Sequence, residues 1–155
     1  EELLTAQTVF KKHYALENGK RSRPYPGVLE GLAAFREAGL RMAVITNKAG
    51  AFTEPLLAAT GLASWFEFAI AGDTLPEKKP HPLPVLHACE RLGSRPEENL
   101  HIGDSKHDAH AARAAGCPVY LVPYGYNEGD DVREIACDAI VSSLLEAAKR
   151  CLPVP

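Results

Sequence analysis

Short apolar runs that end abruptly in polar residues alternate with helical patterns along most of this 155-residue chain. Five such runs occur, at residues 41–46, 66–71, 100–103, 118–122 and 138–141. Apolar residues at helical spacing fill the intervals, at residues 28–37, 52–60, 85–92, 105–115 and 144–151. Strands separated by helices favour parallel βαβ units. The predicted fold class is therefore α/β, with a doubly wound parallel sheet and helices on both faces.

Length and composition are those of an ordinary globular protein, with 46% hydrophobic and 24% charged residues. A chain of this size can bury a core without disulfide or metal staples. The 17 basic and 20 acidic residues give a net charge of −3 and are spread along the chain. The sequence therefore predicts no nucleic-acid partner and no anionic membrane surface as a partner. Apolar runs also stay well below the ~18 residues of a membrane span.

The cysteines indicate a reducing compartment. Cys89, Cys117, Cys137 and Cys151 show no Cys-x-x-Cys spacing, and each lies in an apolar or alanine-rich context. Such contexts are typical of reduced thiols. A cytoplasmic protein is the expectation.

Two aspartates follow the apolar run at residues 100–103. Asp104 comes directly after it, and Asp108 lies four residues further on. At the carboxyl end of a parallel strand, such residues can hold a divalent cation in a phosphate-binding pocket. If the helix begins at Ser105, Asp104 is its N-cap and both carboxylates can face one cleft. The alternative is an ordinary aspartate cap before an alanine-rich helix, which is the commoner case for this stretch taken alone.

Other polar residues are expected at the same edge of the sheet. Thr46 and Asn47 end the run at residues 41–46, and Lys79 lies in a proline-rich loop at residues 74–84. A hydroxyl, an amide and strand-end backbone N–H groups can bind phosphate oxygens, while a lysine neutralises developing charge and carboxylates hold Mg²⁺. Taken singly, these residues have structural alternatives, as a turn, a helix cap or a solvated lysine. Their joint placement at strand ends predicts phosphoryl chemistry.

This combination resembles the haloacid dehalogenase-like superfamily of phosphatases. The run ending in Thr46 is similar to the second motif of that superfamily. Lys79 with the following Pro-His-Pro is similar to the third motif, and residues 103–108 are similar to the fourth. Within the superfamily, four further stretches resemble the phosphoglycolate phosphatases, at residues 23–28, 45–48, 72–76 and 124–127. The last of these could line a pocket, although a turn at Gly125 explains it equally well.

The resemblance implies Mg²⁺-dependent hydrolysis of a small phosphorylated metabolite, with 2-phosphoglycolate as the expected substrate. It implies that Thr46, Asn47 and Lys79 bind the transferring phosphoryl group, with Thr46 and Lys79 also in catalytic roles. Asp104 is implied to ligate Mg²⁺. Asp108 either ligates the metal or orients Lys79 and metal-bound water. The alternatives are other chemistry on the same scaffold, as in phosphomutases and dehalogenases, or a non-catalytic module that binds phosphate or a partner chain.

One motif of the superfamily is missing. Its first motif is an Asp-x-Asp at the end of the first strand, where the first aspartate attacks phosphorus, and no Asp-x-Asp occurs in this sequence. Asp73 and the adjacent pair Asp130 and Asp131 do not replace it. Apolar residues at 3–16 have near-helical spacing, which predicts a helix. In the superfamily a helical cap domain is inserted after the first strand, so the resemblance implies that residues 1–21 are the remnant of that cap.

Residues 22–155 are then expected to form an incomplete α/β core that lacks its central first strand. Such a chain is expected to be the carboxyl-terminal part of a longer phosphatase and to be inactive alone. Its sheet would close through its own neighbouring strands or through strand exchange in a homo-oligomer.

The histidines show no convincing zinc spacing. They are predicted to be surface residues or internally hydrogen-bonded core residues. Those near the motifs are His81, His87, His101, His107 and His110.

Overall fold

The computed structural model describes residues 7–10, 23–125 and 128–154. Its helices are α1 (Val28–Glu37), α2 (Gly50–Ala59), α3 (Leu83–Leu92), α4 (Lys106–Ala115) and α5 (Leu144–Cys151). Its strands are β1 (Gln7–Phe10), β2 (Arg41–Ile45), β3 (Ala69–Ile70), β4 (Asn99–Gly103), β5 (Val119–Leu121) and β6 (Ala139–Ile140). Short 3-10 turns lie at Ala63–Trp65, Pro96–Glu98 and Val132–Glu134.

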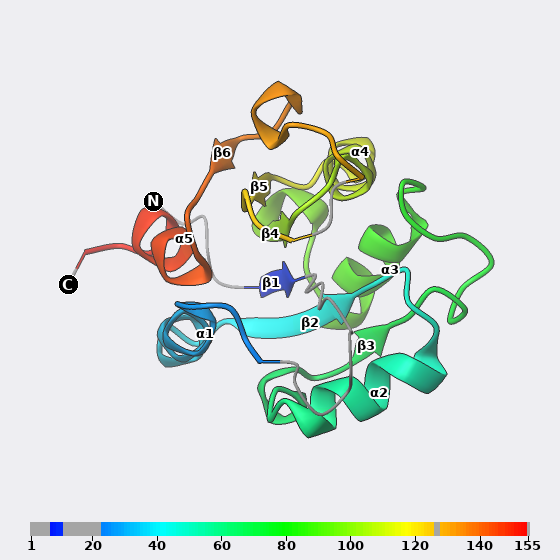
Figure 1. Cartoon of the computed structure of the whole chain (residues 1–155), viewed down its shortest axis with the longest axis horizontal. Helices are drawn as coiled ribbons and strands as arrows, with labels where there is room; N and C mark the ends of the chain where they lie inside the picture. The colour runs from blue at the N-terminus through cyan, green and yellow to red at the C-terminus, as the bar shows by residue number, and fades with distance from the viewer. Residues whose placement is uncertain (1–6, 11–22, 126–127, 155) are drawn as a thin grey trace.

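The described strands form one parallel sheet in the order β3-β2-β1-β4-β5-β6 (Figure 1). Helices α1 and α5 pack together over one face, while α3 and α4 cover the other. The predicted doubly wound α/β class is confirmed. Helices α1 and α5 have the predicted bounds, whereas β3 is shorter than the apolar run that predicted it.

The centre of the sheet is occupied by β1, which lies between β2 and β4. Phe10 is paired with Val44 on one side and with Ile102 on the other. The expectations of a helix across residues 3–16 and of a missing central strand are therefore wrong at residues 7–10. The last three residues of β1 are Thr, Val and Phe, which favour strands, and pairing with two neighbours outweighs a weak helical spacing.

This central strand also removes the reason for expecting strand exchange between copies of the chain, because the gap that exchange would fill is occupied. The remainder of the predicted helix at residues 3–16 lies outside the described residues. So does the predicted domain boundary between residues 21 and 22.

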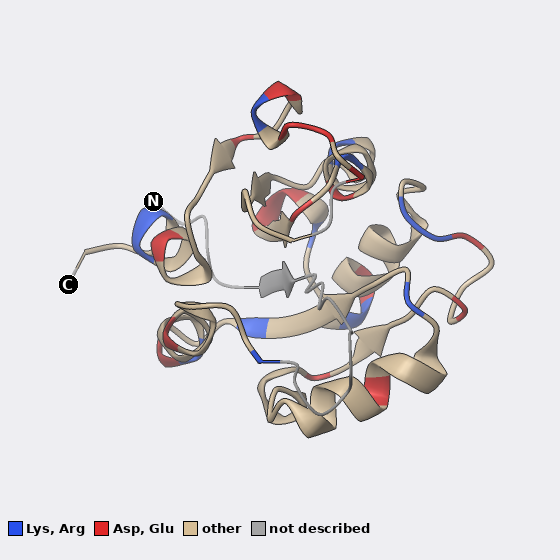
Figure 2. Cartoon of the chain, in the orientation of Figure 1, with Lys and Arg blue, Asp and Glu red and all other residues tan. Residues whose placement is uncertain are grey.

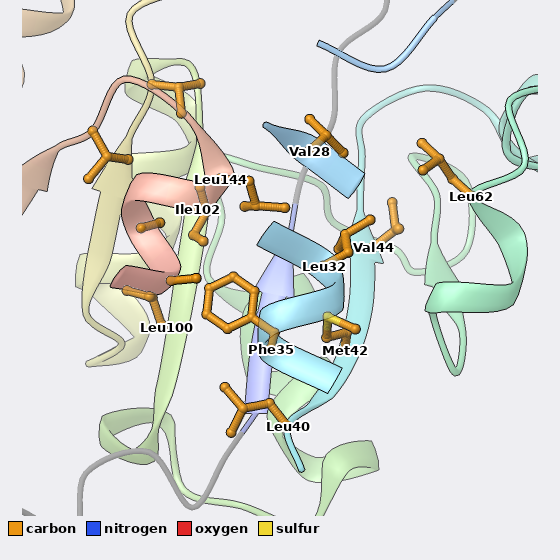
Figure 3. Packing of buried hydrophobic residues seen from close by; sticks show 14 of the residues in the cluster. Val28, Leu32, Phe35, Leu40, Met42, Val44, Leu62, Leu100, Ile102 and Leu144 are labelled. Atoms are coloured by element: carbon orange, nitrogen blue, oxygen red, sulfur yellow. The ribbon is translucent and has the colours of Figure 1, made fainter. Parts of the chain in front are cut away.

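Alternation along the strands divides the core into two layers. In β2, Met42 and Val44 belong to the layer beneath α1 and α5, whereas Ala43 and Ile45 belong to the layer beneath α3 and α4. Figure 3 shows the first layer, with Phe35 of α1 lying among side chains from β2 and β4. The two layers fix the sheet, and with it the positions of the residues that follow each strand.

The register sets two of the predicted site residues level with each other. Val44 and Ile102 are both paired with Phe10. Thr46 and Asp104, two residues beyond these positions, therefore flank the carboxyl end of β1. Neighbouring strands lie ~4.8 Å apart, so the two backbones, which are two strands apart, are separated by about 10 Å.

Charged residues are interspersed over helices and loops (Figure 2). Acidic side chains of the loop after β5 approach the start of α4, where Lys106 Nζ is 3.0 Å from Asp130 Oδ2. Among the described helices, none has the length and apolar character needed to cross a bilayer.

Candidate active site

Lys79 reaches the carboxyl edge of the sheet from the loop between β3 and α3. Its side chain is buried, with only 1% of the residue exposed. Its Nζ donates to the carbonyl oxygen of Ile45 at 3.0 Å and to Oδ1 of Asp108 at 2.8 Å. The ammonium group thus joins the end of β2 to the first turn of α4, the helix that follows β4. The alternative of a solvated loop lysine is wrong.

Asn47 holds the backbone of Lys79 in place. Asn47 Nδ2 donates to the Lys79 carbonyl oxygen at 2.8 Å, and its Oδ1 accepts from the Lys79 N–H at 3.0 Å. These two bonds tie the loop to the end of β2 and orient the lysine inward. The structure gives the Asn47 amide this positioning role, and phosphate binding at Asn47 stays a prediction.

Thr46 is buried at the end of β2. Its backbone N–H donates to the Ile70 carbonyl oxygen at 2.9 Å, which continues the pairing of β2 with β3. Its Oγ1 accepts from the Lys48 N–H at 3.1 Å, so the predicted turn is present. In that bond the hydroxyl is the acceptor, which is compatible with its donating to a phosphate oxygen.

Asp108 lies fully buried in the first turn of α4, and both of its oxygens accept hydrogen bonds. Oδ2 accepts from the N–H groups of Asp104 and Ser105 at 3.1 and 3.2 Å, and from Ser105 Oγ at 3.1 Å. Oδ1 accepts from Lys79 Nζ at 2.8 Å and lies 3.0 Å from His101 Nε2. Of the two predicted roles for Asp108, these contacts favour orienting Lys79 over direct metal ligation.

The helix cap differs from the sequence prediction. Ser105 is the N-cap of α4 and forms a capping box with Asp108 at the third helical position. The prediction that Asp104 is the N-cap is therefore wrong. A capping box satisfies the first backbone N–H groups of a helix, so the carboxylate of Asp104 is not needed for that purpose.

Asp104 is the first residue after β4 and is almost fully buried. The loop after β5 lies against its carboxylate, with Tyr124 and Gly125 at the point of approach. Burial, followed by the proximity of Tyr25 and Asp104, raises the pKa of Tyr124 to about 12. The rings of Tyr25 and Tyr124 are in contact, with centroids 4.4 Å apart. These contacts place the loop after β5 at the rim of the site.

Two glycines allow this close packing around the carboxylates. A Cβ on Gly103 would lie 2.3 Å from Cγ of Asp108, and a Cβ on Gly125 would lie 2.4 Å from Oδ2 of Asp104. Gly125 also has a φ of +99°, a conformation that strongly favours glycine. Neither position accommodates a side chain without displacing a site carboxylate.

Asp104 is the candidate carboxylate ligand for a metal ion among the described residues. No cluster of three or more His, Cys, Asp or Glu side chains suited to a metal occurs within residues 7–10, 23–125 and 128–154. Asp108 is engaged through both oxygens, which leaves Asp104 as the candidate ligand. Mg²⁺ is often bound through one or two carboxylates, with water and substrate phosphate as its other ligands. Asp104 therefore fits one position of a Mg²⁺ site, but a complete set of protein ligands is not present among these residues.

The sequence predicts His101 only as a surface residue or an internally hydrogen-bonded core residue, and the second alternative is confirmed. The structure adds a role at the site that was not predicted, because Nε2 of His101 lies 3.0 Å from the Asp108 oxygen that also binds Lys79. The available signal was a histidine in the middle of a buried strand, at a position where the pattern calls for an apolar residue. Asp73, by contrast, accepts the Gly50 N–H at the start of α2 at 2.9 Å, which is a structural contact.

The sequence matches known proteins along most of its length. A family model described as haloacid dehalogenase-like hydrolase matches residues 2–122. A phosphoglycolate phosphatase from Thiobacillus denitrificans is 58% identical over 147 residues, which cover 94% of this chain and 65% of that protein. The chain thus spans 65% of the length of this relative, and the same share of a phosphoglycolate phosphatase from Nitrosospira multiformis that is 54% identical.

Solved structures show the same fold. A protein described as a predicted phosphoglycolate phosphatase from Haemophilus somnus superposes with a TM-score of 0.81 at 37% identity, covering 85% of this chain and 59% of that one. CbbY from Rhodobacter sphaeroides, solved in complex with phosphate, superposes with a TM-score of 0.72 at 28% identity, covering 81% of this chain and 56% of that one.

Proposed function

The chain belongs to the haloacid dehalogenase-like hydrolase family, and from this premise we propose that its site binds the phosphoryl group of a small phosphate monoester. The names of its relatives favour 2-phosphoglycolate as that substrate. The observation that carries the proposal is the buried ammonium group of Lys79, held between the end of β2 and Asp108 at the carboxyl edge of the sheet.

The geometry supports a division of roles among the residues of the chain. The Lys79 ammonium group lies out of bulk water, where its attraction for phosphoryl oxygens is stronger than in solution. Thr46, level with Asp104 across the end of β1, is placed to donate its hydroxyl hydrogen to a phosphate oxygen. Asn47 and Asp108 position Lys79, one through its backbone and the other through its ammonium group.

We propose Mg²⁺ as the cofactor and Asp104 as the residue of this chain that holds it. When bound, Mg²⁺ would neutralise negative charge on the phosphoryl oxygens. Unpaired cysteines support the further proposal of a cytoplasmic location, since all four are free thiols.

Hydrolysis of a phosphate monoester needs a nucleophile in addition to these residues. A covalent route begins with a nucleophile, and the sequence of β1 contains no carboxylate, nor does the whole sequence contain an Asp-x-Asp. We therefore propose that this chain binds phosphate without hydrolysing a phosphate monoester, and that hydrolysis requires a nucleophile that the chain does not contain. The alternatives of phosphomutase and dehalogenase chemistry have no observation at this site that favours them over hydrolysis.

Calorimetric titration of the purified chain with inorganic phosphate, in the presence of Mg²⁺, tests the binding proposal. Lys79→Gln removes a charge-assisted hydrogen bond and should weaken binding by about tenfold to a hundredfold. Thr46→Val, which leaves the ion pair intact, should also weaken binding. Lys78→Gln is the matched control, because Lys78 is exposed in the same loop. Equal affinities in the wild type and both site variants would contradict the proposal.

Phosphate release from 2-phosphoglycolate tests the second part. We expect no release above the blank from the purified chain with Mg²⁺. Release that disappears in Asp104→Asn would overturn the proposal that the chain lacks turnover, while leaving phosphate binding in place.

A further inference from the structure

His101 occupies an unusual position for a histidine. It lies in the middle of β4, is completely buried, and is paired with Val119 of β5. Val119 belongs to the apolar layer beneath α3 and α4, so the imidazole ring of His101 faces that layer. A polar ring in such a layer is costly unless it is hydrogen-bonded. The burial of His101 therefore requires a hydrogen-bond partner for its ring.

That partner is the carboxylate that also binds Lys79. His101 Nε2 is 3.0 Å from Asp108 Oδ1, and Lys79 Nζ is 2.8 Å from the same oxygen. A carboxylate paired with an ammonium group is ionised and can only accept hydrogen bonds. The network consequently assigns the hydrogen to Nε2 of His101, which donates to Asp108.

The hydrogen bond from His101 affects Lys79, because both side chains donate to the same oxygen, Oδ1 of Asp108. The bond from His101 stabilises part of the negative charge on Oδ1 and fixes the orientation of the carboxylate. Without that bond, Oδ1 would attract the ammonium group of Lys79 more strongly, and less of its positive charge would be available to a phosphate oxygen. The other oxygen is already fixed by the first turn of α4.

We propose that His101 is a positioning residue, which acts through Asp108 to present the Lys79 ammonium group to phosphate. The inference rests on the proposed phosphate-binding function of the site. It extends that function to a residue in the interior of β4 that no motif of the sequence singles out.

Three variants separate positioning from simple packing. His101→Leu fills the apolar layer but removes the donor. His101→Gln keeps an N–H group at about the position of Nε2. Val119→Ala perturbs the same layer on the adjacent strand without touching Asp108, and it serves as the matched control for a loss of packing.

Two measurements on these variants decide the question. In calorimetric titration with inorganic phosphate, His101→Leu should weaken binding by about tenfold, while His101→Gln and Val119→Ala should stay within about threefold of the wild type. In ¹⁵N NMR, the ammonium signal of Lys79 should shift in His101→Leu and stay unchanged in Val119→Ala. Equal phosphate affinity and an unshifted Lys79 signal in His101→Leu would overturn the inference, as would equal losses of affinity in His101→Leu and Val119→Ala.

The wild-type protein supplies the remaining checks. Its imidazole ¹⁵N spectrum should show the hydrogen of His101 on Nε2, and a ring with hydrogen only on Nδ1 would contradict the inference even if the variants do not fold. Failure of the wild type to bind phosphate would count against the proposed function alone, because the Lys79 signal still tests the link from His101 through Asp108.

Discussion

Replacing Lys79 with methionine tests the ion pair at the centre of the site. Methionine fills most of the space of the lysine stem, so the loss is mainly electrostatic. It leaves Asp108 buried and ionised, and it removes the donor from the Ile45 carbonyl oxygen. Breaking a buried ion pair by removing one partner typically costs about 3–5 kcal/mol. The other donors to Asp108 remain, so we expect a loss near the lower end of that range.

Urea denaturation followed by circular dichroism at pH 7 measures this loss. A fall of about 3 kcal/mol corresponds to a decrease in Tm of about 6–12 °C for a chain of this size. The exposed neighbour provides the control, because Lys78→Met should stay within about 0.5 kcal/mol of the wild type. Adding Asp108→Asn to Lys79→Met removes the unpaired charge and should recover at least about 1 kcal/mol. The reasoning is refuted if Lys79→Met and Lys78→Met have the same free energy of unfolding.

Three further perturbations follow from the contacts of the site and the surface. Gly103→Ala places a Cβ 2.3 Å from Cγ of Asp108 and should lower the free energy of unfolding by about 1–3 kcal/mol in urea denaturation. It should also weaken phosphate binding, and unchanged binding would contradict this packing. Asn47→Ala removes two hydrogen bonds to the lysine loop and should cost about 1–3 kcal/mol, whereas a loss of affinity at unchanged stability would point to direct phosphate contact. Arg133 holds the pKa of Asp131 at about 2, from a usual value of 3.8, so the pair stabilises the fold above that usual value and this contribution is lost as the pH falls through about 2. In Arg133→Ala, NMR titration should show the pKa of Asp131 moving towards 3.8, although the backbone N–H of residue 133 still donates to it. An unchanged midpoint would exclude the Arg133 side chain as the cause.

Much of the fold follows from local sequence. The runs at residues 41–46 and 100–103 are strands because β-branched and apolar residues fit a buried sheet, and the intervening helices follow from apolar spacing and glycine stops. In parallel units, polar residues directly after strands must meet at one edge of the sheet. For that reason the sequence alone places Thr46 and Asp104 at a common edge, while Lys79 reaches that edge from the loop between β3 and α3.

The central strand depended on tertiary pairing. Residues 7–10 have a spacing that a helix could accommodate, and a segment of that length carries too little periodicity to distinguish the two states. Pairing with β2 and β4 makes residues 7–10 a strand, since each neighbour supplies a ladder of backbone hydrogen bonds that an isolated segment lacks.

The roles of the individual side chains were also decided by tertiary structure. Strand ends determine which residues share an edge, but hydrogen bonds between distant segments determine what each one does. Asn47 binds the backbone of Lys79, which is 32 residues away in sequence, and Asp108 binds its ammonium group from 29 residues away. His101 joins that network because alternation in β4 turns its ring towards α4. Sequence therefore determined which chemical groups gather at the site, while the packing of loop, strand and helix determined which of them hold Lys79 in place.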